Sequence, residues 1–214
     1  LHQNSHQAEK NKVKFNNYNL LCLNIMSSPG AGKTRLLEIT LEDLSKKFHS
    51  AVLEGDMTTN LDAARLEKLN IPVVPITTGR ACHLDANMVS GGLKLLEKKI
   101  NPDLLDILLV ENVGNLVCPA EFEIGEHFKV ALLSITEGED KPLKYPIMFR
   151  EADLILITKV DLLPHLNFDI NELKSNIAST NPKADVIEIS SITKSGFDLW
   201  QDWISKKILK FKNN

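Results

Sequence analysis

The sequence predicts an α/β protein with a doubly wound, mostly parallel sheet. Two observations lead to this prediction. Six or seven short apolar runs alternate with stretches that have the apolar spacing of helices, and the glycine-rich segment "SSPGAGKT" (27–34) lies between the first such run and the first helix. Runs that are apolar throughout are typical of strands covered by helices on both faces. A length of 214 residues fits one domain of this kind.

The predicted elements follow one another as strand, helix and strand. An apolar run (20–26), a helix (34–48) with apolar residues three and four apart, and a second run (50–55) form a βαβ unit. The pattern continues with strands at 71–77, 106–113, 127–136, 152–160 and 186–190, and with a helix over 85–100. The final segment (196–211) predicts an amphipathic helix whose buried stripe is Leu199, Trp203, Ile204 and Ile208.

Residues 1–18 differ in composition from the rest of the chain. They are rich in Asn, Gln, Lys and His and have no sustained apolar period, which indicates either a mobile arm or a short leading helix. We therefore expect a polar N-terminal arm over 1–18, to which we assign no chemistry, and one domain over 19–214.

Composition excludes several classes of partner. The apolar fraction is 43%, the charged fraction 25% and the formal charge −3, so there is no basic excess to neutralise a nucleic-acid backbone. No apolar run approaches the roughly 18 residues that span a bilayer, and the first residues are too polar for a secretory signal. We expect a cytoplasmic protein without a nucleic-acid or membrane partner. Three cysteines do not make a disulfide framework, so free thiols are expected.

The glycine-rich segment has the context of a phosphate-binding loop, because it follows a strand and opens a helix. Gly30 and Gly32 let the backbone turn its amides toward a phosphate. Lys33 would reach the β and γ phosphates, and the Thr34 hydroxyl would bind Mg2+. Ser27 replaces the usual first glycine, which costs little if that residue is extended. The alternative is a turn that only caps the helix.

The base-reading element is predicted at Thr158-Lys159-Val160-Asp161, which resembles the Asn/Thr-Lys-x-Asp motif of GTPases. A carboxylate at Asp161 can accept from the ring N1–H and the exocyclic amine of guanine, a pattern that adenine does not offer. Ser190 and Ser191 follow where GTPases place a loop that touches the guanine oxygen. The alternative is an ordinary surface loop.

Two acidic strand ends, "EGD" (54–56) and "ENVGN" (111–115), are candidates for holding Mg2+. Carboxylates at the C-terminal ends of strands beside a phosphate loop face the phosphate site, so we select Asp56 and Glu111. Glu111 with Gly114 resembles the Asp-x-x-Gly of GTPases with Asp changed to Glu. The alternative for each acid is a helix N-cap or a surface position.

Two thiols and one imidazole, Cys82, His83 and Cys118, form a ligand set suited to Zn2+ or Ni2+. If each subunit of a symmetric pair supplied these residues, the metals would lie near the dimer axis. The alternative is that Cys82 and Cys118 are small buried hydrophobes. Cys22 lies inside the first strand and is expected in the core, and His127 is expected at the surface or a strand edge with no role.

The combination of "SSPGAGKT", "EGDMTTNLDAARL", "TTGRACHLDANM", "LLVENVGNLVCPAEFEIGE", "TEGEDKPLKYP" and "TKVDLLPHLNFD" closely resembles the HypB family, GTPases that assist nickel insertion into [NiFe]-hydrogenase. The resemblance runs from about residue 20 to the C-terminus. It implies a SIMIBI-type P-loop GTPase that dimerises with nucleotide, binds nickel or zinc, and works with a HypA-type nickel metallochaperone and the hydrogenase large subunit.

The resemblance also implies a set of site residues. The metal ligands fall on Cys82, His83 and Cys118. The family's nucleotide contacts fall on Gly30 to Arg35, Lys159 and Asp161. With the motifs described above, the expected nucleotide-binding residues are Pro29, Gly30, Ala31, Gly32, Lys33, Thr34, Arg35, Thr158, Lys159, Asp161, Ser190 and Ser191. A lysine that reaches the partner subunit's nucleotide corresponds to Lys141 or Lys144. The first residues, "LHQNSHQAEK", contain neither the Cys-x-x-Cys-Gly-Cys motif nor the histidine tract of some family members, so we expect the metal site within the GTPase domain.

Our hypothesis is that GTP-Mg2+ closes a dimer and reshapes the Cys82, His83 and Cys118 site, and that slow hydrolysis reopens it. The related urease GTPase is an alternative, although its Cys-Pro-His motif differs from Cys118-Pro119-Ala120 here. A P-loop small-molecule kinase is a second alternative, which the scattered arginines disfavour. A metal-binding protein with a relic nucleotide site is a third. Ni2+ and Zn2+ share these ligands, so the metal stays open.

Overall fold

The computed structural model describes residues 2–58 and 61–213. Its centre is a seven-stranded sheet in the order β3-β2-β4-β1-β5-β6-β7, and every neighbouring pair is parallel. Strand β1 lies between β4 and β5. The strands on its two sides belong to different halves of the sheet, so the order of the strands reverses at the end of β1. Open parallel sheets bind ligands at this point. The predicted fold class is confirmed.

The strands lie close to the predicted runs. They are β1 (Leu21–Ser27), β2 (Ser50–Asp56), β3 (Val73–Thr77), β4 (Ile107–Glu111), β5 (Phe128–Ser134), β6 (Leu154–Thr158) and β7 (Asp185–Ile189). The α-helices are α1 (His2–Asn17), α2 (Lys33–Leu44), α3 (Leu61–Glu67), α4 (Ala86–Leu96), α5 (Cys118–Glu121), α6 (Lys141–Lys144), α7 (Pro146–Arg150), α8 (Ile170–Thr180) and α9 (Phe197–Lys212). Short 3-10 turns are η1 (Pro102–Leu104), η2 (Ile135–Glu137) and η3 (Val160–His165).

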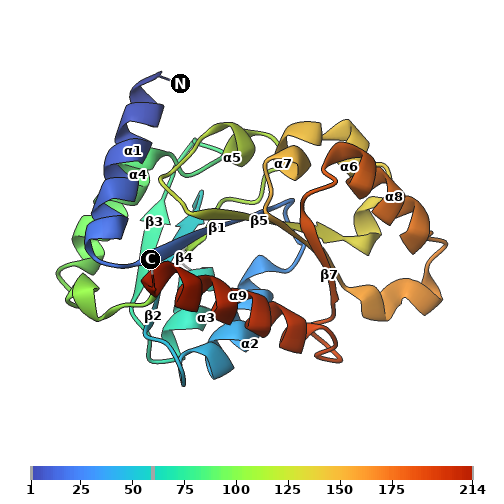
Figure 1. The fold of residues 1–214 in the computed structure, drawn as a ribbon. Coiled ribbons are helices and arrows are strands. Elements are labelled where there is room, and N and C mark those ends of the chain that lie inside the picture. The colour runs from blue at the N-terminus through green and yellow to red at the C-terminus, as the bar shows by residue number, and fades with distance from the viewer. Residues whose placement is uncertain (1, 59–60, 214) are drawn as a thin grey trace.

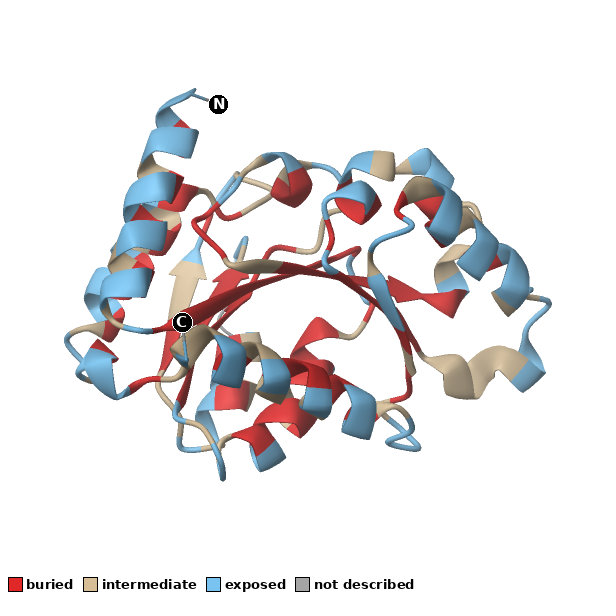
Figure 2. Ribbon diagram, viewed as in Figure 1, coloured by how far each residue is buried: buried red, intermediate tan, exposed pale blue. Residues whose placement is uncertain are grey.

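Helices cover both faces of the sheet, which explains why its inner strands are apolar on both sides. Helices α2, α3 and α9 lie on one face, while α1, α4 and α5 to α8 lie on the other (Figure 1). Every residue of β1, β4 and β6 is buried, and Figure 2 shows the central strands as a continuous buried layer. Within the described residues, no helix combines the length and apolarity needed to cross a membrane.

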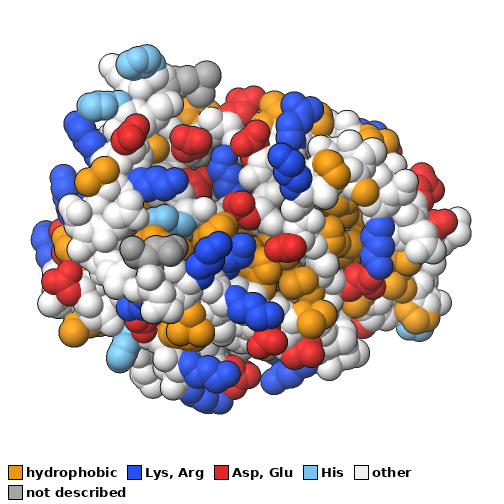
Figure 3. All heavy atoms as spheres, viewed as in Figure 1, with side chains coloured by type: hydrophobic (Ala, Val, Ile, Leu, Met, Phe, Trp, Pro, Cys, Tyr) orange, Lys and Arg blue, Asp and Glu red, His pale blue; other side chains and the backbone are white. Residues whose placement is uncertain are grey.

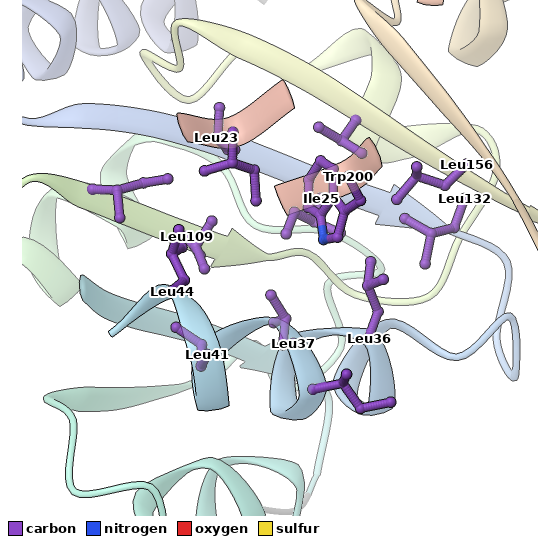
Figure 4. Close-up of a cluster of buried hydrophobic side chains, with 14 of the residues drawn as sticks. Leu23, Ile25, Leu36, Leu37, Leu41, Leu44, Leu109, Leu132, Leu156 and Trp200 are labelled. Atoms are coloured by element: carbon purple, nitrogen blue, oxygen red, sulfur yellow. The ribbon is translucent and has the colours of Figure 1, made fainter. Parts of the chain in front are cut away.

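The core between α2, α9 and the sheet fixes the helix that follows the phosphate loop. Leu36 and Leu37 of α2 point toward β1, and Trp200 of α9 lies among them (Figure 4). The Trp200 ring N–H donates to Thr40 Oγ1 at 2.8 Å, so the two helices are joined by a buried hydrogen bond as well as by packing.

The buried stripe predicted for the last helix was partly wrong. Trp203, Ile204 and Ile208 are buried as predicted, but Leu199 is 57% exposed and Trp200 is fully buried in its place. The helix begins after Gly196, whose φ of 73° is in the left-handed region and where a Cβ would come 2.0 Å from the Glu188 carbonyl oxygen. This close turn sets the rotation of the helix and turns Leu199 toward solvent.

The first residues form a long docked helix, so of the two predicted forms the structure has the helix. Helix α1 spans 16 residues and packs against α4. Its buried residues are Asn4, Ala8, Asn11 and Phe15, a helical stripe in which two of four members are amides. A pattern that counts only apolar residues does not register such a stripe, so the docking was not predicted.

His127 has the strand-edge position that was predicted, but it does have a structural role. Its Nδ1 accepts from the Cys22 N–H at 2.9 Å, and its ring packs edge-on against Phe211 with centroids 4.5 Å apart. Burial, together with nearby Lys12, lowers the pKa of His127 to about 4, so the ring is neutral at physiological pH and can accept at Nδ1. Cys22 is fully buried, as predicted.

Candidate functional site

The glycine-rich segment forms a loop between β1 and α2. Ser27 is the last residue of β1, which confirms the extended conformation expected for it, and its Oγ accepts from Lys33 Nζ at 2.9 Å. Gly30 and Gly32 have φ angles of 76° and 99°, in the left-handed region that favours glycine. Because the N–H groups of the first turn of α2 have no partner within the helix, this loop is suited to binding an anion.

A cavity of about 440 Å3 lies beside this loop. Its walls are the phosphate loop, the start of α2 and the ends of β2 and β4. Four carboxylates line it, from Glu54, Asp56, Asp62 and Glu111. The Arg35 and Arg65 guanidinium groups also line it, and both form ion pairs with the Glu38 carboxylate. The cavity therefore combines an anion-binding loop with a cluster of acids that can hold a cation.

Glu111 and Glu54 are buried acids in neighbouring strands. They are register partners between β4 and β2, and their exposed fractions are 3% and 2%. Glu111 Oε1 accepts from the Thr34 hydroxyl at 2.7 Å, whereas Oε2 of each acid lacks a hydrogen-bond partner among the described residues. Buried carboxylate oxygens without a donor, next to a threonine hydroxyl, fit the oxygen ligands that Mg2+ prefers.

The same burial changes the protonation of these groups. Desolvation raises the pKa of Glu54 to about 8, and the neighbouring Glu111 and Asp56 charges add to this effect. Desolvation also raises the pKa of Glu111 to about 7, although Lys33 and the Thr34 hydrogen bond oppose it. Burial lowers the pKa of Lys33. In each case burial favours the uncharged form.

Glu54 and Asp62 line the cavity but were not predicted from the sequence. Of the two acids in "EGD", Asp56 was selected because it stands at the strand end, and the structure places it half-buried in the cavity wall. Glu54 lies two residues earlier on the same face of β2. The period of two along a strand was the signal that could have identified it.

The predicted base-reading residues lie against the phosphate loop. The Thr158 hydroxyl donates to the Ala31 carbonyl at 2.8 Å, and Lys159 Nζ donates to the Gly30 carbonyl at 2.7 Å. Lys159 has a φ of 61°, so its backbone adopts a conformation that is uncommon for a residue with a side chain. These contacts place the strand end of β6 directly beside the loop that would hold the phosphates.

Asp161 is held by the side chain of Ser190. From the sequence, the loop of Ser190 was expected only to touch the guanine oxygen. The Ser190 hydroxyl donates to Asp161 Oδ1 at 2.5 Å, and the N–H groups of Ile192 and Thr193 donate to the Ser190 oxygen. Ser191 is half-buried in the same turn. The hydrogen bond fixes the orientation of the carboxylate that would read guanine.

Cys82, His83 and Cys118 come together although 36 residues separate the two thiols. Their candidate ligand atoms all lie within 4.8 Å of one another, with 2.9 Å between the two sulfur atoms and 3.8 Å between Cys82 Sγ and His83 Nδ1. All three residues are half-buried, and the His83 ring lies on Phe122 with centroids 4.1 Å apart. Both thiols are thus close enough, together with the imidazole, to bind one ion. We call these three residues the thiol cluster.

The surroundings of the thiol cluster favour the uncharged forms of Cys118 and His83. The pKa of Cys118 is raised, first by its hydrogen bond with Cys82 and then by desolvation, and burial lowers the pKa of His83. A neutral imidazole is the form that binds a metal, and thiols release protons when a metal binds.

The loop from Glu111 to Cys118 joins the cavity to the thiol cluster. A Cβ at Gly114 would come 2.9 Å from Pro29 Cα, so this loop lies directly on the phosphate loop. Asn112 is fully buried, and its Oδ1 accepts from the N–H of Leu84, the residue after His83, at 2.9 Å. One short segment therefore contacts the phosphate loop and the residue after His83, and it ends at Cys118.

Lys141 and Lys144, which were considered for a role across a dimer, each contact a residue at an end of α6. Lys144 forms an ion pair with Asp140, and Lys141 Nζ lies 5.2 Å from the centre of the Tyr145 ring.

Comparison with known proteins gives consistent matches. A family model described as the CobW/HypB/UreG nucleotide-binding domain matches residues 21–188. The chain is 48% identical over 208 residues to the hydrogenase maturation factor HypB of Azotobacter vinelandii, covering 97% of this chain and 67% of that protein. It is 40% identical over 207 residues to the hydrogenase/urease maturation factor HypB of Helicobacter pylori, covering 97% of this chain and 85% of that protein.

Solved structures agree with these matches. The crystal structure of HypB from Helicobacter pylori in complex with nickel has a TM-score of 0.92 at 39% identity, covering 97% of this chain and 96% of that chain. FtsY from Mycoplasma mycoides, with a TM-score of 0.55 at 14% identity over 79% of this chain and 59% of that chain, shares the fold alone. The chain therefore belongs to the CobW/HypB/UreG nucleotide-binding family and, within it, to the HypB hydrogenase maturation factors.

Proposed function

We propose that the protein is a GTP-hydrolysing metallochaperone that assists nickel insertion during [NiFe]-hydrogenase maturation. In this proposal GTP binding promotes a homodimer, and the nucleotide state changes the affinity of the thiol cluster for nickel. The observation that carries the proposal is the loop from Glu111 to Cys118, which contacts the phosphate loop through Gly114 and reaches the metal motif through Asn112.

The nucleotide part of the proposal rests on the phosphate loop and on Asp161. Lys33 Nζ lies over the loop, where it donates to Ser27 Oγ and could instead contact a bound phosphate. The Ser190 hydroxyl orients the Asp161 carboxylate. Thr34, Glu111 and Asp56, with Glu54, would hold Mg2+, which when bound offsets phosphate charge. These groups supply positioning and charge stabilisation, so we expect slow intrinsic hydrolysis.

The contacts of the loop from Glu111 to Cys118 support the proposal that nucleotide and metal affect each other's binding. A change at the phosphate loop that moves Gly114 also moves Asn112, because only one residue separates them. Asn112 holds the N–H of Leu84, and Leu84 packs so closely on β2 that a Cβ at Gly55 would come 2.6 Å from its side chain. If nucleotide and metal each favour one arrangement of this loop, each changes the affinity of the other by the same factor.

The partners of the proposal are a second copy of this chain, a HypA-type nickel metallochaperone and the hydrogenase large subunit, in the cytoplasm. The Helicobacter pylori relative named as a hydrogenase/urease factor supports urease maturation as a second target. Zn2+ is the competing metal, because it shares the ligand set.

The test is a nickel titration of the full chain with GDP and with a non-hydrolysable GTP analogue, recording thiolate charge-transfer absorbance and molecular mass together. We expect the dissociation constant for nickel to differ about 5-fold or more between the two states, the lower limit of typical coupling. Cys118→Ala should abolish the absorbance, and Cys22→Ala, which changes a core thiol, should not.

Two results contradict the proposal. Identical nickel binding in both nucleotide states rules out gating, and equal binding of GTP and ATP analogues rules out the base-reading role of Asp161.

A further inference from the structure

The buried stripe of α1 contains two asparagines, Asn4 and Asn11, with exposed fractions of 9% and 2%. Asparagine is mostly exposed in proteins, and a buried amide is costly unless it is hydrogen-bonded. The outer face of α1 carries the charged, polar and His side chains seen at the upper left of Figure 3. These two amides therefore need hydrogen-bond partners inside the protein.

Both side chains bind the same two segments of backbone. Asn4 Oδ1 accepts from the Ala86 N–H at 2.9 Å, and Asn4 Nδ2 donates to the Glu123 carbonyl at 2.8 Å. Asn11 Nδ2 donates to the Ala86 carbonyl at 2.7 Å and to the Ile124 carbonyl at 2.9 Å. Each amide is thus a bridge between residue 86 and residues 123–124.

These two segments follow the ligands of the thiol cluster along the chain. Ala86 is three residues after His83, and Glu123 is five residues after Cys118. Phe122, whose ring lies on His83, directly precedes Glu123. Holding the Glu123 carbonyl therefore also holds the residue against which the imidazole packs.

Between the two bridges, the helix backbone contacts the same loop. Gly125 has a φ of 98°, and a Cβ there would come 2.6 Å from the Ala8 carbonyl oxygen and 2.9 Å from the Lys12 nitrogen. Ala8, between the two asparagines, is 2% exposed. Small residues on both sides thus let α1 lie close enough for both amides to reach.

We propose that α1 is the positioning element of the thiol cluster: Asn4 and Asn11 hold the Cys82–His83 segment and the Cys118 segment at the separation at which their ligands meet one ion. The inference rests on the proposed function, because that function makes nickel the metal with which the thiol cluster is tested. A helix that only covers the core would affect stability alone, whereas a positioning element also sets metal affinity and ligand geometry.

The experiment compares Asn4→Ala, Asn11→Ala and the double variant in the full chain. Nickel affinity and the thiolate charge-transfer spectrum are measured with GDP affinity and the melting temperature. We expect nickel affinity to fall about 10-fold or more in the double variant, as for other residues that orient metal ligands, with a shifted spectrum. GDP affinity should stay within about twofold, because α1 does not line the nucleotide cavity.

Three further variants separate positioning from stability. Asn4→Asp keeps an acceptor for Ala86 but loses the donor to Glu123, so it should weaken nickel binding although the side-chain size is retained. Phe15→Leu alters the packing of α1 without touching either bridge, and exposed Asn17→Ala lies on the same helix. Both should leave the nickel spectrum unchanged.

A second readout needs no metal. Diamide oxidation should close a disulfide between Cys82 and Cys118 in the wild type, whose sulfur atoms are 2.9 Å apart, about 10-fold faster than in the double variant. If the wild type binds no nickel through Cys118, the proposed function fails, and the oxidation rates still decide the role of α1. Equal oxidation rates, or a lower melting temperature with unchanged nickel affinity and spectrum, would overturn the inference.

Discussion

Glu54 has a carboxyl group whose surroundings favour its neutral form. It is 2% exposed, it lies beside Glu111 across two neighbouring strands, and burial raises its pKa to about 8. Lys33 Nζ donates to the Ser27 hydroxyl and to neither acid. Without a bound cation, charging both acids is therefore costly, so this pair lowers the stability of the fold when both acids are ionised.

A pH dependence follows from this. Because the pKa of Glu54 is about 8 in the folded state and near 4.5 in the unfolded state, its contribution to stability is fully present below pH 4.5 and is lost as the pH rises through 8. Replacing Glu54 by Gln removes this loss of stability at high pH, because the amide does not ionise. We expect ligand-free Glu54→Gln to melt about 5 °C higher than wild type at pH 8.5, corresponding to roughly 2 kcal/mol, with a much smaller difference at pH 5.

The measurement is thermal unfolding from pH 5 to pH 9 without nucleotide or Mg2+. Glu67→Gln, an exposed acid at the end of α3, is the control and should follow the wild type at every pH. A constant offset between Glu54→Gln and wild type across this range would show that the Glu54 carboxyl does not titrate there.

At the scale of elements, the phosphate loop depends on how α2 is held by α9. Trp200 is fully buried between them and donates to Thr40, whose hydroxyl donates in turn to the Leu36 carbonyl at 2.6 Å. Leu199, one residue earlier, is exposed to solvent. Adjacent residues of α9 should therefore differ sharply in their contribution to stability.

We expect Trp200→Ala to lower the free energy of unfolding by about 3–5 kcal/mol, because it leaves a large cavity and removes the buried hydrogen bond to the Thr40 hydroxyl. Leu199→Ala should change it by less than about 0.5 kcal/mol. Urea unfolding of both variants checks this, with GDP affinity as a second measurement. Similar losses in the two variants would mean that α9 is rotated relative to the arrangement described above.

At the scale of the whole molecule, Asn112 tests whether the two sites communicate. In wild type the nickel dissociation constant should differ between the GDP and GTP-analogue states, and Asn112→Ala should bring this ratio to about 1, since the Leu84 contact is lost. Asn24→Ala is the matched control: it removes the partner of Asn112 Nδ2 but leaves the Oδ1 contact to Leu84. The idea fails if both variants retain the wild-type ratio.

Much of this architecture could be predicted because it depends on local patterns. The central strands are largely apolar, and the phosphate loop is a contiguous motif with glycines at two positions of positive φ. The rest depends on contacts between distant segments. Glu54 is a site residue only because β4 lies beside β2, and the burial of Trp200 instead of Leu199 depends on the turn at Gly196. Helix α1 docks through amides, which an apolar period does not detect.

The hydrogen bonds from α1 also affect the order in which the fold forms during synthesis. Asn4 and Glu123 are 119 positions apart, so α1 emerges from the ribosome long before its partner. At about 5–20 residues per second, the wait is roughly 6–24 s. For that time α1 lacks one side of its binding site, and the nascent chain presents its two asparagines to solvent. Of the segments that these bridges join, the one translated earliest is thus also among those that reach their final contacts late.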